Sequence, residues 1–194
     1  MALWDDFQAW IGVSPSKEKT APVEEQPKPV EPKATPKPDF YERLSMAESS
    51  NNPKAKSKTS SAGGLFQFID STWKGVVKQH NLGHSLEDKY DPKKAKEAAV
   101  IHNEWNKRYL QKSLGYEPTE GQLYAAWFLG ANGAKTLLTA SPKQLAKEVV
   151  KPSQVNANEQ MFYVGRYEGK KFIRERPRTV GEVYQLLSKK IGEE

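Results

Sequence analysis

The chain has no cysteine among its 194 residues, so disulfide bonds, thiol nucleophiles and cysteine-based metal sites are excluded. It also has no run of 18 apolar residues, the length that would predict a membrane-spanning helix. The N-terminal residues, MALWDDFQAWIGVSPS, carry two aspartates where an export signal would be basic, and their apolar stretch is short. We therefore predict a protein made in the cytoplasm without a signal peptide.

Metal and cofactor sites are also not expected. The histidines His80, His84 and His102 have no metal-binding spacing with one another, and Asn81 and Gly83 would interrupt a helix across HNLGH. A glycine-rich phosphate loop and a GxSxG nucleophile motif do not occur. The sequence thus predicts neither a metal ion nor an organic cofactor.

Large apolar residues are scarce in residues 1–38, where seven of the 13 prolines lie. That segment has five lysines against six acidic residues, a net charge of −1, whereas residues 39–194 have 25 basic against 18 acidic residues, a net charge of +7. We predict three parts: an N-terminal helix at 1–12, an extended proline-rich linker at 13–39 and a folded domain at 40–194. The basic domain suits an acidic polymer; its charge alternatively serves only solubility.

Residues 2–11 have the periodicity of a short amphipathic helix. Its apolar face would consist of Leu3, Trp4, Phe7, Trp10 and Ile11. A helix of this length is marginal alone and needs a surface to pack on. Docking on its own domain and binding to a partner protein both stay open, while an acidic polar face disfavours membrane insertion.

From Phe40 onward the pattern is mostly helical. Phe40, Leu44 and Ala47 share one helix face, which places Glu48 in the last turn. The strongest strand candidate is KKFIRER, paired in a small hairpin with MFYVGRY. The predicted fold class is therefore mainly α.

Further helix starts are indicated by capping residues. They are Asp70, Asp91 before Pro92, and the capping boxes Thr119–Gln122, Ser141–Gln144 and Thr179–Glu182. Asp70 and Asp91 are thus interpreted as caps and not as catalytic carboxylates.

Glu48 is the candidate for acid–base chemistry. A carboxyl at the end of a packed helix, facing aromatic residues, is partly desolvated, and its pKa rises. A carboxylic acid that stays protonated near neutral pH can donate a proton to a glycosidic oxygen. A surface glutamate at a helix end is the plainer interpretation of the same position.

The stretch ESSNNPKAKSKTSSAGGLFQFIDSTW, residues 48–73, resembles the motif of the soluble lytic transglycosylases, the goose-lysozyme-like peptidoglycan lyases. Like the family pattern, it has Glu-Ser, Asn-Pro with an alanine, a serine-bearing loop, Gly-Leu-x-Gln and Thr-Trp. A second stretch, AAWFLGANGAKTLL at 125–138, is similar to the family motif Ala-Tyr-Asn-x-Gly. The resemblance covers about residues 40–191 and implies a lysozyme-like helical domain.

The resemblance also implies residue roles. Glu48 would be the single acid and base that cleaves the bond between N-acetylmuramic acid and N-acetylglucosamine and closes a 1,6-anhydro ring. Ser49 would help to hold Glu48, and Ser60 would contact the sugar, with Ser57 and Ser61 as alternatives.

Other substrate contacts follow from the same motifs. Gln67 would hydrogen-bond the glycan between Phe66 and Phe68, which would line the cleft. Gly63 and Gly64 would let the backbone approach the ligand closely. Trp73 is expected to pack in the core.

Two adjacent positions depart from the family pattern. The tyrosine that supports the catalytic glutamate is replaced by Trp127, and the asparagine after it by Phe128. An indole N–H donates a hydrogen bond but accepts none, although Trp127 could stack on a sugar. Tyr124, one helical turn earlier, is the alternative source of a hydroxyl.

Three classes of function remain. The leading prediction is a lytic transglycosylase packaged in a bacteriophage particle through residues 1–12, where it would contact another tail or ejection protein and open the wall during genome ejection. A secretion-system wall enzyme and an inactive glycan-binding or structural module are the alternatives. Nucleic-acid binding is disfavoured, because the lysines are not interleaved with stacking aromatics.

Overall fold

The computed structural model describes residues 38–193. The predicted helix at 1–12 and nearly all of the linker at 13–39 therefore lie outside the described residues. The described part is mostly helical with one small antiparallel sheet, which confirms the predicted mainly α, lysozyme-like class. In chain order the elements are α2 (Phe40–Ser49), α3 (Asp70–Gln79), the 3₁₀ helix η1 (Glu87–Tyr90), α4 (Pro92–Leu114), α5 (Glu120–Thr139), α6 (Ala146–Val149), α7 (Pro152–Ala157), α8 (Glu159–Phe162), β1 (Tyr163–Glu168), β2 (Lys171–Pro177) and α9 (Val180–Lys190).

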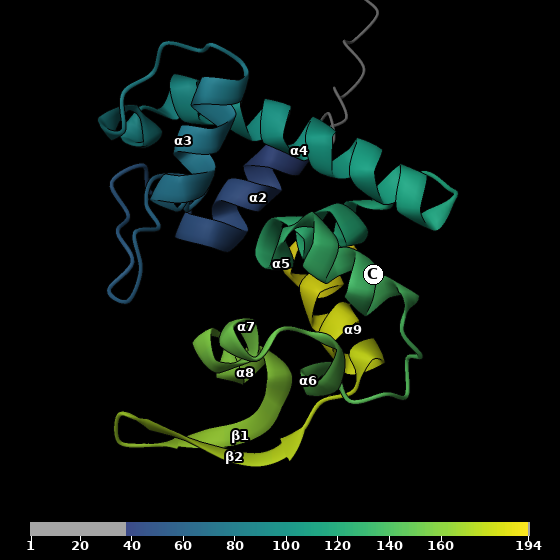
Figure 1. Cartoon of the computed structure of the whole chain (residues 1–194). Coiled ribbons are helices and arrows are strands. Elements are labelled where there is room, and N and C mark those ends of the chain that lie inside the picture. Colours follow the sequence, from purple (N-terminus) through teal and green to yellow (C-terminus); the bar gives the residue numbers. More distant parts are fainter. Residues whose placement is uncertain (1–37, 194) are drawn as a thin grey trace, which may run out of the picture. The chain divides into compact units, whose positions relative to one another are not determined.

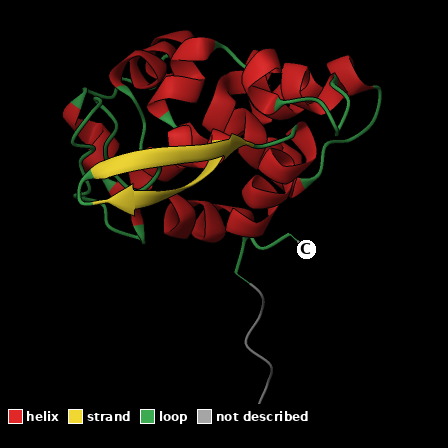
Figure 2. Cartoon of the chain, turned by 90° about the horizontal axis from the view of Figure 1, so that it is seen from below, coloured by secondary structure: helices red, strands yellow, loops and turns green. Residues whose placement is uncertain are grey.

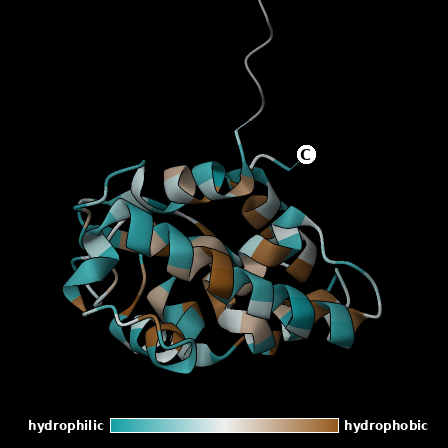
Figure 3. Cartoon of the chain, turned by 90° about the horizontal axis from the view of Figure 1, so that it is seen from above, coloured by the Kyte–Doolittle hydropathy of each residue, from teal (hydrophilic) through white to brown (hydrophobic). Residues whose placement is uncertain are grey.

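The long helix α4 packs against α2, α3 and α5, and α9 packs mainly against α5 (Figure 1). Side chains from nearly all of these helices meet in one core, whose fully buried members include Leu44, Trp73, Tyr124, Phe162 and Leu187. Along the helices, hydrophobic and hydrophilic segments alternate, as expected for helices with one buried face (Figure 3). Trp73 packs in the core, where its indole N–H donates to the Ser85 carbonyl oxygen (2.8 Å).

Several predicted helix starts are confirmed. Asp91 accepts hydrogen bonds from two backbone amides of the first turn of α4, and Thr119 and Thr179 form complete capping boxes at α5 and α9. A further capping box, between Asp39 and Glu42, starts α2. These local bonds explain why the helices begin where the sequence pattern indicates.

Two predicted caps are wrong. Asp70 is the first residue of α3 and forms no cap; its carboxylate instead binds the Lys89 ammonium group. Ser141 starts no helix, because its segment pairs with the chain before α9: Leu145 forms an isolated β-bridge to Thr179. Tertiary backbone hydrogen bonds thus override the local capping pattern there.

The predicted hairpin is confirmed, although Met161 and Phe162 belong to α8 and β1 begins at Tyr163. Its two strands run antiparallel beside the short helices (Figure 2). An irregularity in register follows Val164. At the next residue, Gly165, a Cβ would lie 2.2 Å from the Ile173 carbonyl oxygen, so this position requires glycine.

Candidate functional site

The end of α2 determines where Glu48 lies. The hydroxyl of the next residue, Ser49, donates to the Ser45 carbonyl oxygen (3.1 Å) and accepts from the Asn52 amide (3.1 Å). In the described residues it forms no hydrogen bond with the Glu48 carboxyl. Ser49 therefore stabilises the turn that follows Glu48.

The chain reverses directly after this turn. Ser50 and Asn51 have left-handed φ angles of 54° and 59°, a conformation that costs a non-glycine residue on the order of 1–2 kcal/mol. The Asn51 amide donates to the Ser45 carbonyl oxygen (3.2 Å), and the Ser45 hydroxyl bonds the Asn51 side chain. These bonds stabilise the reversal and hold Glu48 at the edge of the following loop.

The Glu48 side chain is half-buried. Burial removes its carboxylate from water and raises its pKa above the ordinary 4.5. The Tyr124 hydroxyl and the positive charge of Lys190 lower this pKa, but burial is the largest influence. No second acidic side chain of residues 38–193 contributes to the shift. The environment of the Glu48 carboxyl thus favours its protonated form.

Tyr124 of α5 is fully buried and faces Glu48. Burial and the neighbouring carboxylate raise the pKa of its phenol, so that it stays a neutral hydrogen-bond donor. Although the two groups influence each other's pKa, no hydrogen bond of standard geometry joins them, and the hydroxyl has no partner elsewhere in the described residues. Catalytic hydrogen bonds are often long in unliganded sites and tighten around the substrate.

The loop between α2 and α3 folds back on itself. Gly63 forms isolated β-bridges to Lys56 and to Phe68. Gln67 takes a left-handed φ of 49°, and its side-chain amide donates to the Gly64 carbonyl oxygen (2.9 Å). Its amide nitrogen therefore stabilises the loop, while its carbonyl oxygen is a candidate acceptor for a ligand hydroxyl.

The buried Lys89 side chain fastens this loop by hydrogen bonds to Ser61 and Asp70. Its ammonium group, on a side chain that is only 5% exposed, donates to the Ser61 carbonyl oxygen (2.8 Å) and to the Asp70 carboxylate (2.5 Å). A Cβ at Gly64, whose φ is +78°, would lie 2.1 Å from the Lys89 carbonyl oxygen, and one at Gly63 would lie 2.6 Å from the Tyr90 hydroxyl. Gly63 and Gly64 are therefore needed for a close approach to the chain itself, while an approach of their backbone to a ligand stays a prediction.

Aromatic side chains lie behind the loop. Phe66 and Phe68 are 2% and 3% exposed. Both contact the half-buried Trp127 edge to face, with ring centroids 6.2 and 5.2 Å apart. The two phenylalanines thus pack against Trp127 from the core. Of the three rings, that of Trp127 is the most exposed and could contact a ligand.

The chain beyond α9 fastens together the helices that carry Glu48 and Tyr124. From α2, Arg43 donates to the Ile191 carbonyl oxygen (2.9 Å) and forms an ion pair with Glu120 of α5. Glu193 accepts from the Gly121 amide (2.7 Å) and from the Thr119 hydroxyl (3.1 Å) at the N-terminus of α5, where a negative charge is favoured. These bonds fix α2 relative to α5.

The structure thus brings Glu48, Ser49 and Tyr124 together, with Trp127 one helical turn after Tyr124. Gln67 lies in the loop between α2 and α3, where its neighbours Phe66 and Phe68 contact Trp127. Ser60 is exposed in the loop, where its hydroxyl accepts from the Ala62 amide (3.3 Å). Residues that the sequence did not indicate, and that hold or influence this candidate site, are Arg43, Lys89, Lys190 and Glu193. Each acts through a partner distant in sequence, so no local pattern marks it.

Residues 38–193 contain no group of three or more histidine, aspartate or glutamate side chains that could hold a metal ion. In the same residues no helix has the length and apolarity needed to span a membrane.

One comparison with known proteins bears on this site. The family model described as "Transglycosylase SLT domain" matches residues 33–144, more than half of the chain. The match includes α2, the loop and α5, and thereby Glu48, Gln67 and Tyr124. It ends before the hairpin and α9, so Lys190 and Glu193 lie beyond it.

Proposed function

Because the chain belongs to the transglycosylase SLT domain family, we propose that it is a peptidoglycan lytic transglycosylase in which Glu48 is the only catalytic acid and base. The observation that carries this proposal is the half-buried Glu48 carboxyl with its raised pKa, beside the Tyr124 hydroxyl and with no second carboxyl acting on it in the described residues. Most glycoside hydrolases need two carboxyl groups, one on each side of the sugar. A single carboxyl group is sufficient when a hydroxyl of the substrate itself displaces the leaving group.

The reaction balances without water. Protonated Glu48 donates its proton to the glycosidic oxygen, and the bond from that oxygen to C1 of N-acetylmuramic acid breaks. The C6 hydroxyl oxygen of the same sugar then bonds to C1, and its proton passes to the Glu48 carboxylate. The products are a free 4-hydroxyl on N-acetylglucosamine and a 1,6-anhydro ring, and Glu48 returns to its protonated form.

We assign to the Tyr124 hydroxyl the supporting role that a tyrosine at the position of Trp127 has in the family pattern. Between the two proton transfers Glu48 is an anion in a poorly solvated site, where a hydrogen bond from a neutral phenol stabilises it. The mutual pKa influence of Glu48 and Tyr124 supports this role. Trp127 is then left to stack on a sugar ring.

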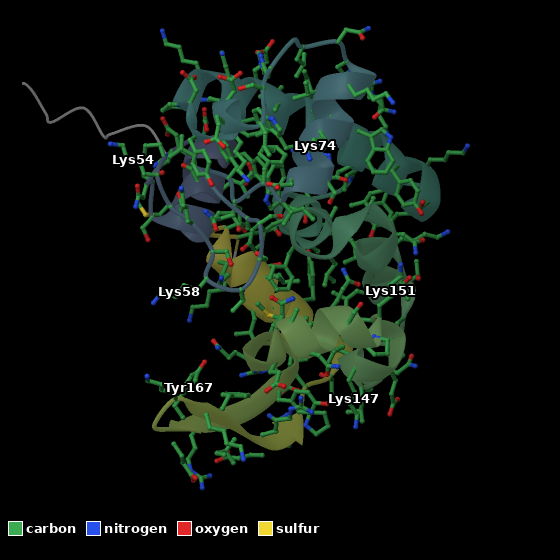
Figure 4. All side chains as sticks on the ribbon, turned by 60° about the vertical axis from the view of Figure 1, so that its left-hand side comes forward. Lys54, Lys58, Lys74, Lys147, Lys151 and Tyr167 are labelled. Carbon is green, nitrogen blue, oxygen red and sulfur yellow. The ribbon has the colours of Figure 1, made fainter. Side chains whose placement is uncertain are left out.

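Exposed lysines suit the proposed substrate, because the stem peptides of peptidoglycan carry carboxylates. They include Lys54, Lys58, Lys74, Lys147 and Lys151. In Figure 4 the side chains of Lys54 and Lys58 project outward from the loop after α2, and Tyr167 projects from β1. Gln67 and Ser60 of the same loop are the proposed polar contacts to the glycan.

A bacteriophage particle is the setting that we propose for this activity. Its support is the sequence of residues 1–39 alone: an apolar face on residues 2–11, suited to a tail or ejection protein, joined to a proline-rich tether. Copurification of the full chain with phage particles, and its loss when Trp4, Phe7 and Trp10 are replaced by serine, would support this setting. A secretion system as the location would contradict it.

The experiment for the activity uses purified peptidoglycan and mass spectrometry of the released muropeptides. We expect the full chain to release anhydro-muropeptides and Glu48→Gln to release none. Glu42→Gln is the matched control, because it makes the same change on the exposed side of α2 and glutamine retains the capping box. An active Glu48→Gln variant would refute the role of Glu48.

One observation favours a second candidate, a glycan-binding module without catalysis. It is the replacement of the family's Tyr-Asn by Trp127 and Phe128. A wild-type chain that binds glycan strands but releases no products would establish this alternative.

A further inference from the structure

Helix α4 carries three aromatic side chains that the proposed reaction does not use. His102, Trp105 and Tyr109 follow at i, i+3 and i+7 and therefore lie on one side of the helix; we call them the aromatic strip. Trp105 is 48% exposed, unusually open for the largest apolar side chain. The strip thus offers aromatic surface to solvent.

The rings of the strip are nearly parallel. The centroids of His102 and Trp105 are 6.4 Å apart at an interplanar angle of 9°, and those of Trp105 and Tyr109 are 5.6 Å apart at 23°. The Tyr109 hydroxyl donates to the Asn132 side-chain oxygen (3.2 Å), which holds its ring to α5. The rings therefore form a preorganised row of stacked aromatic groups.

The strip is continuous with the proposed reaction centre. His102 contacts Trp127 edge to face, with centroids 5.4 Å apart. Trp127 follows Tyr124, the neighbour of Glu48, by one turn of α5. A polymer that lies over Trp127 could therefore extend along the strip.

A small cavity lies beside Trp105, between α3 and α4. Its volume is about 200 Å³, and its lining includes Thr72, Gly75 and Gln79 of α3 together with His102 and Trp105. A Cβ at Gly75 would meet no atom within 4 Å. This space is large enough for a short polar substituent such as an acetamido group.

We propose that the aromatic strip and this cavity form a binding surface for sugar rings of the glycan strand beyond the pair that is cleaved. Pyranose rings have an apolar face of C–H bonds, which fits the electron-rich face of an aromatic ring. The acetamido groups of the strand fit a cavity with hydroxyl, amide and imidazole groups in its wall. The proposal rests on the proposed peptidoglycan function and assigns Trp105 to substrate binding.

The test measures binding of glycan strands, freed from stem peptides and fractionated by length, to the full chain with Glu48→Gln, so that cleavage does not interfere. We expect added Trp105→Ala to raise the Kd for long strands about tenfold, the size of effect that follows loss of an aromatic stacking contact. Trp105→Phe should recover part of the affinity. Tyr116→Ala, which removes an aromatic side chain of similar exposure (51%) after the end of α4, is the matched control.

A second variant probes the cavity. Gly75→Leu fills it and favours the helix, since glycine is a poor helix former, so the protein should stay folded while long strands bind more weakly. In the chain that keeps Glu48, Trp105→Ala should raise KM on long strands and leave kcat unchanged. A general loss of structure would instead lower kcat.

The outcomes separate the two proposals. If the Glu48→Gln chain binds long strands and Trp105→Ala binds them equally well, the aromatic strip is refuted and the proposed function stands. An equal loss for single disaccharides would also refute it, since Trp105 would then belong to the reaction centre. If neither glycan binding nor product release occurs with any variant, the proposed function fails and the strip with it.

Discussion

Replacing Tyr124 with phenylalanine removes the hydroxyl that faces the Glu48 carboxyl and leaves the ring in the core. A hydrogen bond to a charged group contributes about 1.5–3 kcal/mol, which corresponds to about a 10- to 150-fold loss in kcat if the bond exists only while Glu48 is an anion. The free energy of unfolding should change little, because the hydroxyl has no partner of standard geometry in the described residues.

Tyr124→Phe should also change how the cleavage rate depends on pH. The Tyr124 hydroxyl lowers the pKa of Glu48, so Tyr124→Phe raises it further. Cleavage begins with protonated Glu48, and activity falls as the pH rises through that pKa. The alkaline limb of the pH–rate profile should therefore move to higher pH in the variant.

The assay is the initial rate of anhydro-muropeptide release across the pH range of this limb. Tyr184→Phe is the matched control, since its hydroxyl lies 3.3 Å from the Thr119 hydroxyl and is not among the groups that shift the pKa of Glu48. An unchanged kcat and an unmoved limb for Tyr124→Phe would refute the supporting role of this hydroxyl.

Four further predictions concern charge and packing. Lys190→Met removes the positive charge that lowers the pKa of Glu48, so the alkaline limb should again move to higher pH in rate measurements; an unmoved limb would contradict this. Glu48→Gln should raise Tm at neutral pH, because burial disfavours the ionised form of Glu48 in the folded state. The gain in Tm should vanish below the ordinary pKa of 4.5; an equal gain at all pH values would contradict this origin. Lys89→Met should lower the free energy of unfolding by about 1–3 kcal/mol in denaturant titrations. The loss should exceed that of Lys94→Met, because the Lys94 side chain is 43% exposed and that of Lys89 only 5%; equal losses would count against a loop held by Lys89. Gly64→Ala should lower the free energy of unfolding by at least about 2 kcal/mol. The φ of Gly64 is +78°, and the added Cβ would meet the Lys89 carbonyl oxygen; an unchanged free energy in the same titrations would refute the close packing.

Much of the helical fold follows from local patterns. The apolar face of Phe40, Leu44 and Ala47 indicates α2 and puts Glu48 in its last turn, as observed. Thr119 and Thr179 start helices because a capping box needs only residues that are neighbours in sequence.

The remaining features depend on contacts between distant segments. Ser141 has the same capping pattern as Thr119, yet its segment pairs with the chain before α9, which no short window contains. Asp70 likewise forms an ion pair with Lys89, which is distant in sequence, and does not cap α3. The approach of Tyr124 and Lys190 to Glu48 arises only when α5 and α9 pack against each other.

The central claim is that Glu48 alone cleaves the glycan without adding water. The most direct test digests peptidoglycan in water enriched in heavy oxygen and weighs the released muropeptides. Our account predicts products that are one water lighter than the hydrolysis products, carry no heavy oxygen, and are absent with Glu48→Gln. Products with one heavy oxygen at the reducing end of N-acetylmuramic acid would show hydrolysis and contradict the account.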